Sequence, residues 1–298
     1  MAAAVNIVEV GPRDGLQNEK EIVSVGTKVT LIERLASAGA RSVEAGAFVS
    51  PKWIPQMAAT DEVMAAIRRK PGVSYPVLTP NLKGYEGARA AKADTVAVFG
   101  AASEAFSRKN INCSVAESIE RFKPVFEAAK AEGVRVRGYV SCVLGCPYEG
   151  RIPVRNVVRI AKALYDLGAY EISLGDTIGV GTPRETKAIL SAVAGEVPVA
   201  KLAGHYHDTY GQALANIWAS LEGGVATFDS SVSGLGGCPY AKGASGNVAT
   251  EDVVYSLHQS GLATGIDLDA LIETSLWISE KLGRRPQSKV TLARMPKA

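Results

Sequence analysis

The stretch Gly204-His205-Tyr206-His207-Asp208-Thr209-Tyr210-Gly211 follows the apolar run from Val197 to Leu202 and holds two of the three histidines in the chain. On a β-strand, residues i and i+2 point to the same face, so we expect His205 and His207 to present two imidazoles side by side. Imidazole is the commonest protein ligand for divalent metals, and this spacing therefore indicates a metal site at the end of a strand. The alternative is a polar strand edge that binds no metal, because short motifs also arise by chance.

Short apolar strands alternate with helices on both sides of this stretch. Strands are predicted over residues 5–10, 41–47, 73–78, 94–99, 134–140, 169–174 and 224–232, with a further one ending at the histidine pair. Helices are predicted over 56–69, 82–91, 248–259 and 268–281, and others begin near residues 24, 114, 182 and 209. One more helix carries Val157, Ile160, Ala161 and Leu164 along one stripe. Ser114 and Thr182 each precede a glutamate by three residues, which forms a capping box. Eight strand–helix units match a (β/α)8 barrel of about 250 residues.

The predicted fold class is α/β: a TIM barrel in a single catalytic domain, residues 1–298, with the barrel over about 5–260 and a short C-terminal helical extension over about 261–298. Alternating strands and helices would also suit an open doubly wound sheet. Polar residues favour closure, because barrel active sites collect side chains from the carboxyl ends of different strands. Arg13 and Asp14 follow the first predicted strand, Glu44 lies near the end of the second, and Asp176 follows the sixth.

The composition argues against several classes of protein. A formal charge of +3, from 33 basic and 30 acidic residues, and the lack of a dense Lys/Arg block speak against nucleic acid as a partner. No uninterrupted apolar run reaches membrane-spanning length, so we expect no membrane partner. Four cysteines without a CxxC pair favour thiols in a reducing compartment, and no targeting signal is visible at the N-terminus. The expected location is cytoplasmic.

Two further residues complete a candidate metal site. Asp14 offers a carboxylate from the first loop, and Asn247 offers an amide oxygen from the loop after the eighth strand. With His205 and His207 they form a set of two nitrogens and two oxygens, which suits Mg²⁺ or Mn²⁺ and is less favoured for Zn²⁺. Local roles are the alternatives, because Asp often forms an Asx-turn and Asn often caps a helix.

A pair of opposite charges is predicted beside this metal site. Arg13 carries a planar guanidinium that can stabilise an oxyanion or an enolate. Glu44 is flanked by Val43 and Ala45, so its charged side chain is expected to face the barrel interior and to need a partner. Arg13 is the obvious partner. A purely structural ion pair is the alternative.

The loop 233–247 contains glycines at five positions and one thiol, Cys238. A glycine-rich loop can close over a site, and a thiol at its tip could donate or accept a proton. The other cysteines, Cys113, Cys142 and Cys146, lack such a setting and are expected to be buried small apolar residues.

Residues 8–19, 205–208 and 234–247 resemble the 3-hydroxy-3-methylglutaryl-CoA lyase family, and the resemblance extends over nearly the whole chain. Residues 98–104 add to it. The set of Arg13, Asp14 and Glu44 also resembles the wider superfamily of metallolyase barrels, which includes isopropylmalate and homocitrate synthases and hydroxy-oxovalerate aldolases. The superfamily part is shared and therefore less specific than the segment around Cys238.

The resemblance implies metal-dependent cleavage of (S)-3-hydroxy-3-methylglutaryl-CoA to acetyl-CoA and acetoacetate, in leucine catabolism and ketone body formation. It implies that Asp14, His205, His207 and Asn247 hold the divalent metal. The implied catalytic residues are Arg13, which binds substrate and neutralises the enolate, Glu44, Cys238 as the acid, and His205 as the candidate base. Asp176 follows the sixth predicted strand, where a carboxylate could support the catalytic residues. The implied partner is a small acyl-CoA, and a homodimer is expected.

Two other functions stay open from the sequence. The first is a related synthase or aldolase that uses the same metal and Arg13 to form a carbon–carbon bond. The second is a metal-binding barrel without catalysis, which the grouping of Arg13, Glu44 and Cys238 around the ligands disfavours.

Overall fold

The protein is described by a computed structural model that covers residues 4–237 and 246–295. Nine strands in this part of the chain form one sheet in the order β2-β1-β9-β8-β7-β6-β5-β4-β3, and every pairing is parallel. The strands are β1 (Asn6–Glu9), β2 (Ser42–Val43), β3 (Gly46–Ala47), β4 (Val77–Leu78), β5 (Thr95–Ala101), β6 (Arg135–Ser141), β7 (Glu171–Asp176), β8 (Leu202–Tyr206) and β9 (Thr227–Ser230).

The sheet closes on itself through the segment 42–47. β2 pairs with β1 and β3 pairs with β4, and only Glu44 and Ala45 separate the two short strands. The Glu44 amide donates to the Glu9 carbonyl at 2.9 Å, and the Ala45 amide donates to the Pro76 carbonyl at 2.8 Å. The segment therefore acts as one barrel strand, which leaves eight strand positions in a ring. The predicted TIM barrel is confirmed, and the alternative of an open sheet is wrong.

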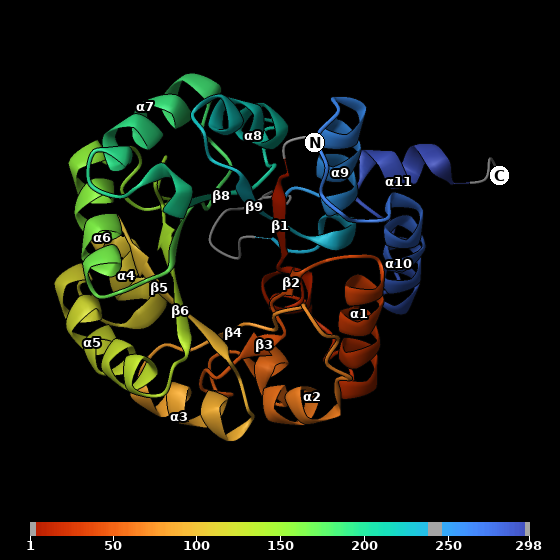
Figure 1. Cartoon of the computed structure of the whole chain (residues 1–298), viewed down its shortest axis with the longest axis horizontal. Helices are drawn as coiled ribbons and strands as arrows, with labels where there is room; N and C mark the ends of the chain where they lie inside the picture. The colour runs from red at the N-terminus through yellow and green to blue at the C-terminus, as the bar shows by residue number, and fades with distance from the viewer. Residues whose placement is uncertain (1–3, 238–245, 296–298) are drawn as a thin grey trace.

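Helices surround this ring (Figure 1). They are α1 (Val25–Ser37), α2 (Thr60–Ala66), α3 (Leu82–Ala90), α4 (Glu104–Ile111), α5 (Val115–Ala131), α6 (Val154–Asp166), α7 (Pro183–Ala194), α8 (Ala213–Glu222), α9 (Thr250–Gln259), α10 (Leu268–Lys281) and α11 (Lys289–Arg294). The capping boxes predicted at Ser114 and Thr182 are present at the starts of α5 and α7. The helix predicted over 268–281 is confirmed as α10, which lies beside α1, where Arg34 stacks on Trp277 with 5.1 Å from Cζ to the ring centre.

Three local predictions near the carboxyl ends of the strands were wrong. The helix after the histidines begins at Ala213 rather than near Thr209, because the Asp208 carboxylate accepts the Ala213 amide at 3.0 Å and a turn fills the interval. Helix α4 was missed, although the Ser103 hydroxyl caps its first turn. The segment that holds Arg13 is a short π-helical turn, η1 (Gly11–Gly15), rather than an irregular loop.

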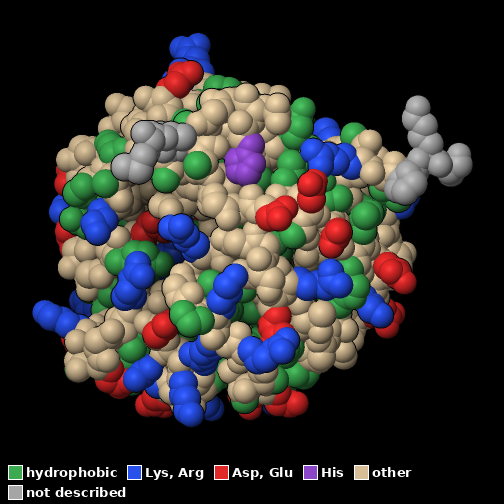
Figure 2. Space-filling model, turned by 45° about the vertical axis from the view of Figure 1, so that its right-hand side comes forward, with side chains coloured by type: hydrophobic (Ala, Val, Ile, Leu, Met, Phe, Trp, Pro, Cys, Tyr) green, Lys and Arg blue, Asp and Glu red, His purple; other side chains and the backbone are tan. Residues whose placement is uncertain are grey.

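The surface and the interior differ in how they carry charge. On the face shown in Figure 2, basic and acidic side chains are interspersed. Inside the barrel the apolar core is interrupted by charged side chains with almost no exposure, namely Glu44, Arg137 and Asp229. Buried charges need partners, and their partners lead to the functional site. Within the described residues, no helix is long and apolar enough to cross a membrane.

Candidate metal centre and active site

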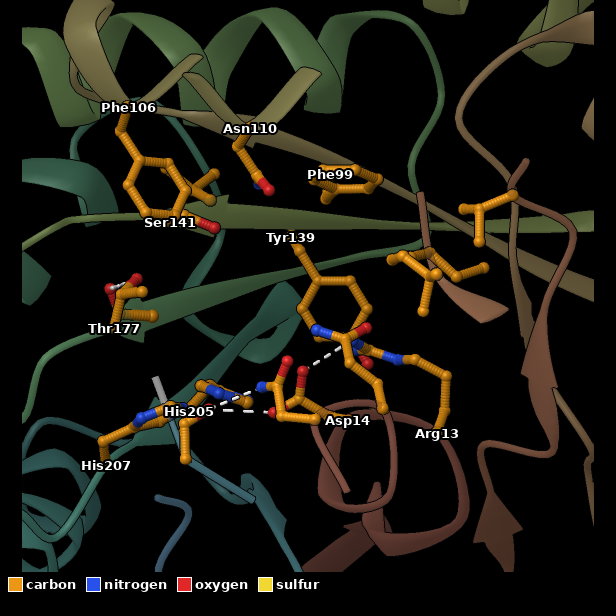
Figure 3. A pocket seen from close by; sticks show the side chains of 18 residues that line it. Arg13, Asp14, Phe99, Phe106, Asn110, Tyr139, Ser141, Thr177, His205 and His207 are labelled. Carbon is orange, nitrogen blue, oxygen red and sulfur yellow. Dashed lines mark hydrogen bonds and ion pairs between the residues drawn. The ribbon is translucent and has the colours of Figure 1, made fainter. Parts of the chain in front are cut away.

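A cavity of about 130 Å³ opens at the carboxyl end of the barrel strands. Its lining includes polar residues from four elements, namely Asp14 in η1, Ser141 at the end of β6, Thr177 after β7 and His205 in β8. Figure 3 shows Asp14 and the histidines on the side opposite the Phe99 and Phe106 rings, with Tyr139 between them. The cavity therefore offers a polar floor to a reacting group and an apolar wall to a carbon chain.

Three of the predicted metal ligands meet at this floor. Asp14, His205 and His207 each offer one ligand atom, and these atoms lie within 4.8 Å of one another. The two imidazole ring centres are 5.3 Å apart, as the i, i+2 spacing on β8 predicts. His207 Nε2 lies 4.0 Å from Asp14 Oδ2. Two imidazoles and a carboxylate at this separation can hold a divalent cation.

Asn247 lies against the same carboxylate. Its Nδ2 donates to Asp14 Oδ2 at 2.8 Å, and its backbone bridges to His207. The residue that caps α9 is Ala249, so the alternative that Asn247 is a helix cap is wrong. The side chain of Asn247 therefore stands beside the three ligands, where its amide could contribute a further oxygen.

Arg13 joins the metal ligands to the barrel interior. Its Nε donates to Glu44 Oε2 at 2.8 Å, and its Nη1 donates to Asp14 Oδ1 at 2.6 Å. Glu44 is fully buried and Arg13 is 6% exposed, so the predicted ion pair is present inside the barrel. Burial raises the pKa of Glu44, and the charge of Arg13 opposes that effect. The guanidinium also reaches the cavity wall, which a purely structural ion pair would not need to do.

The charges of this group favour metal binding. Burial alone would raise the pKa of Asp14, but the charges of Arg13 and the two histidines outweigh it and hold the pKa well below its usual range. Burial and the neighbouring His205 lower the pKa of His207 to about 4. The carboxylate is therefore ionised and the His207 imidazole neutral at pH 7, and these are the forms that bind metals.

Sequence reasoning missed the charged residues behind His205. Asp229 Oδ2 lies 3.2 Å from His205 Nδ1, and Arg137 Nη2 lies 2.8 Å from Asp229 Oδ1. Burial would raise the pKa of Asp229, but Arg137 and His205 lower it to about 2. Arg137 lies on β6 and Asp229 on β9, but neither is flanked by apolar side chains on both sides, which was the signal that had identified Glu44.

Asp176 is held away from the cavity. Its carboxylate accepts the Gly181 amide at 2.8 Å and the Val180 amide at 3.2 Å, and burial raises its pKa to about 6. Its neighbours Gly175 and Thr177 line the cavity, whereas Asp176 does not. Asp176 therefore shapes the loop after β7, which supports the wall of the site.

The cysteine predictions divide into two groups. Cys113, Cys142 and Cys146 are buried, as expected, and none of these three forms a disulfide. Cys238, the predicted catalytic thiol, lies outside the described residues. Gly237, the residue before it, lines the cavity, and its carbonyl accepts the Asn18 amide Nδ2 at 2.6 Å.

Residues 4–278 match the family described as HMGL-like. The chain belongs to the HMGL-like family. It is 60% identical over 289 residues to the mitochondrial hydroxymethylglutaryl-CoA lyase of Gallus gallus, covering 97% of each chain. It is 58% identical over 294 residues to the 3-hydroxy-3-isohexenylglutaryl-CoA/hydroxy-methylglutaryl-CoA lyase of Pseudomonas aeruginosa, covering 99% of this chain and 98% of the relative. The crystal structure of hydroxymethylglutaryl-CoA lyase from Pseudomonas aeruginosa is similar, with a TM-score of 0.96 and 57% identity over 98% of each chain. The family resemblance predicted from the sequence is confirmed.

Proposed function

We propose that this protein cleaves (S)-3-hydroxy-3-methylglutaryl-CoA to acetyl-CoA and acetoacetate in a retro-Claisen reaction that depends on a divalent metal. The observation that carries this proposal is the meeting of Arg13 with Asp14, His205 and His207 at one cavity. Relatives with that lyase name match almost the full length of the chain, which supports the same substrate, a small acyl-CoA. Leucine catabolism is the corresponding proposed pathway.

Asp14, His205, His207 and Asn247 would hold the metal. This mixed set of nitrogen and oxygen donors suits Mg²⁺ or Mn²⁺ better than it suits Zn²⁺. The lowered pKa values of Asp14 and His207 fit such an ion, because both groups are in their ligating forms at neutral pH. When bound, the ion would polarise the oxygens of the substrate.

The remaining chemistry divides among the residues of this chain. A base removes the proton of the C3 hydroxyl, the O–H electron pair forms the ketone of acetoacetate, and the pair of the C2–C3 bond moves into the enolate of acetyl-CoA. Arg13, whose guanidinium is fixed by Glu44 and Asp14, would stabilise that enolate. Cys238 would then protonate the carbanion, and the position of Gly237 at the cavity supports its reach.

His205 is proposed both as a ligand and as the base. Its Nδ1 faces Asp229, so Nε2 is the nitrogen open to the cavity. A nitrogen that binds a metal has no lone pair for a proton, and His205 would therefore perform the two tasks at different moments of the cycle.

We also propose a homodimer in the cytoplasm. The dimer follows from the family resemblance, and light scattering of the purified protein tests it. The buried thiols of Cys113 and Cys146 are in keeping with a reducing compartment.

A mass-spectrometric product assay tests the proposed reaction. The purified protein is incubated with (S)-3-hydroxy-3-methylglutaryl-CoA, with and without Mg²⁺ or Mn²⁺, and acetyl-CoA and acetoacetate are expected in equal amounts only with metal. A parallel incubation with acetyl-CoA and a set of 2-oxo acids tests the synthase alternative. Condensation products there, without cleavage in the first assay, would overturn the proposal.

A further inference from the structure

The two imidazoles of the metal cluster are held in different ways. His205 Nδ1 faces the Asp229 carboxylate at 3.2 Å. His207 Nδ1 is buried, and within the described part of the chain it makes no hydrogen bond. The His205 ring is therefore held by a carboxylate at Nδ1, and the His207 ring has no such contact at Nδ1.

Asp229 is itself fixed on both of its oxygens. Oδ2 accepts the Ser173 hydroxyl at 2.7 Å in addition to facing His205, and Oδ1 forms an ion pair with Arg137 Nη2 at 2.8 Å. Ser173 lies on β7, Arg137 on β6 and Asp229 on β9, and all three are at most 1% exposed. The carboxylate therefore has a contact on each oxygen, and together these contacts hold it facing the imidazole.

Arg137 requires a negative partner at this position. Its Nε donates to Glu171 Oε2 at 2.7 Å and its Nη1 donates to the Tyr139 hydroxyl at 2.9 Å, so its third contact, to Asp229, completes the fork. A guanidinium with almost no exposure is not deprotonated, and a carboxylate paired with it accepts hydrogen bonds and donates none.

We propose that Asp229, held by Arg137 and Ser173, is a positioning residue that keeps His205 in the Nδ1–H tautomer and fixes its ring plane. The proton on Nδ1 then leaves Nε2 as the nitrogen that serves the cluster of Asp14, His205 and His207. The inference rests on the metal site of the proposed function, but it concerns a state of His205 that exists in the metal-free protein. No such anchor restricts His207, so the two histidines of the motif have unequal roles.

Nitrogen-15 NMR of the metal-free protein tests the tautomer directly. The chain has three histidines, and a His258→Gln variant assigns the signals of the one outside the cluster. At a pH high enough to leave His205 neutral, it is expected as the Nδ1–H tautomer in the wild type, and Asp229→Asn is expected to convert it to a mixture of tautomers. A wild-type spectrum with the proton of His205 on Nε2 would overturn the inference without any measurement of activity.

Mn²⁺ affinity, followed by electron paramagnetic resonance, gives the second readout. Loss of a carboxylate behind a ligating histidine weakens metal binding by roughly 10- to 100-fold, which is the loss expected for Asp229→Asn. Ser173→Ala removes one donor to the same carboxylate and is expected to have a smaller effect in the same direction. It also serves as the test if Asp229→Asn does not fold.

The matched control is Asp252→Asn. Asp252 is also a buried carboxylate, 7% exposed, but its partners Ser288, Lys289 and Val290 all lie at the start of α11. This variant is expected to keep the tautomer of His205 and the affinity for Mn²⁺. Equal losses in Asp252→Asn and Asp229→Asn would show a general structural effect and would reject the positioning role. A wild-type protein that binds no Mn²⁺, yet shows the Nδ1–H tautomer, would reject the metal site of the proposed function instead.

Discussion

Two groups of carboxylates in this barrel, all with little or no exposure, have partners of different charge. In the first, at the mouth of the barrel, Asp14 and Glu44 both contact the guanidinium of Arg13. We call Arg13, Asp14, Glu44 and the two histidines the mouth cluster. Asp14 remains ionised there despite its burial.

In the second group, Glu9 and Glu251 lie between η1, η4 (Val232–Gly234) and the C-terminal helices. The Glu9 carboxylate accepts the amides of Gly11 and Val232 and the Thr250 hydroxyl, at distances from 2.7 to 3.0 Å. The Glu251 carboxylate accepts the Ser233 amide at 3.0 Å and the Thr291 hydroxyl at 3.1 Å. We call Glu9 and Glu251, with these donors, the C-terminal cluster.

The cause of the difference is the charge of the partners. Burial raises the pKa of Glu9 and of Glu251 to about 7, because the neutral donors around them do not outweigh the loss of solvation. A full positive charge in contact with Asp14 does outweigh it. Asp14 thus keeps its charge at neutral pH, although the pKa of Glu44, beside the same guanidinium, is raised by burial, and the C-terminal cluster carries a cost in stability at neutral pH.

The largest expected effect comes from removing a ligand from the mouth cluster. Asp14→Ala and His207→Ala are each expected to abolish Mn²⁺ binding and to leave the fold intact, because each deletes a proposed ligand at the barrel mouth and no apolar core side chain. Calorimetric titration with Mn²⁺ measures the binding, with Asp166→Ala, an exposed carboxylate on α6, as the control. Unchanged Mn²⁺ affinity in either variant would remove that residue from the ligand set.

Replacing the charge partner of the mouth cluster comes next. Arg13→Lys keeps the positive charge but loses the fork that contacts Glu44 and Asp14 together, so kcat is expected to fall by roughly 10²- to 10³-fold, as for loss of one oxyanion donor. Substrate affinity is expected to change less. Steady-state kinetics measure both values, and Arg68→Lys, at an exposed ion pair, serves as the control. A kcat within twofold of the wild type would show that the ion pair is structural only.

A smaller loss is expected at Cys238, the thiol proposed as the acid. Cys238→Ser should reduce turnover by about 10²-fold and preserve Mn²⁺ binding, because a hydroxyl is a far weaker acid than a thiol of pKa about 8.5. Cys113→Ser, at a buried thiol away from the cavity lining, is the matched control. Acetoacetate release is measured in both variants, and equal losses would end the case for Cys238 as the acid.

The C-terminal cluster should affect stability rather than turnover. Because burial raises the pKa of Glu251 from 4.5 to about 7, the folded protein keeps a proton there that the unfolded chain has released between these pH values. The stabilisation is therefore present below about pH 4.5 and is lost as the pH rises through about 7, a change of roughly 3–4 kcal/mol for one group. Glu251→Gln should make the free energy of unfolding decrease less as the pH rises, although Glu9 still titrates in this variant.

Urea unfolding at pH 5 and pH 8 measures the effect of Glu251→Gln. The free energy of unfolding of the wild type is expected to fall more between the two pH values than that of the variant. Glu62→Gln, at an exposed position on α2, should behave like the wild type. Parallel pH profiles of Glu251→Gln and the wild type would contradict the assigned cause.

The sequence predicted the barrel because its signals are local and repeated. The capping boxes at Ser114 and Thr182 and the i, i+2 histidines each follow from residues a few positions apart. Helix α11 was missed because its six residues are too few to show a helical period. The turn η1 was missed because its π-helical backbone has no common sequence signature.

The site was only partly predictable for a different reason. Strand ends supplied Asp14 and His205, because closure of the barrel brings all strand ends to one face. Asp229 and Arg137 are brought together by the ring of strands, and their sequence positions alone do not reveal that they meet.

Closure of the barrel also determines when the site can exist during synthesis. β1 pairs with β9, from Asn6 opposite Thr227 to Glu9 opposite Ser230. During synthesis, β1 can therefore pair with β2 early, but it cannot pair with β9 until residues 227–230 have left the ribosome. Until then both outer strands of the growing sheet are open edges, which are prone to pair with other chains. Asp14 emerges early and Asn247 late, and they contact each other only in the closed ring. A nascent chain shorter than 247 residues therefore lacks the contact between Asn247 and Asp14, and the proposed set of four ligands can assemble only after residue 247 has been made.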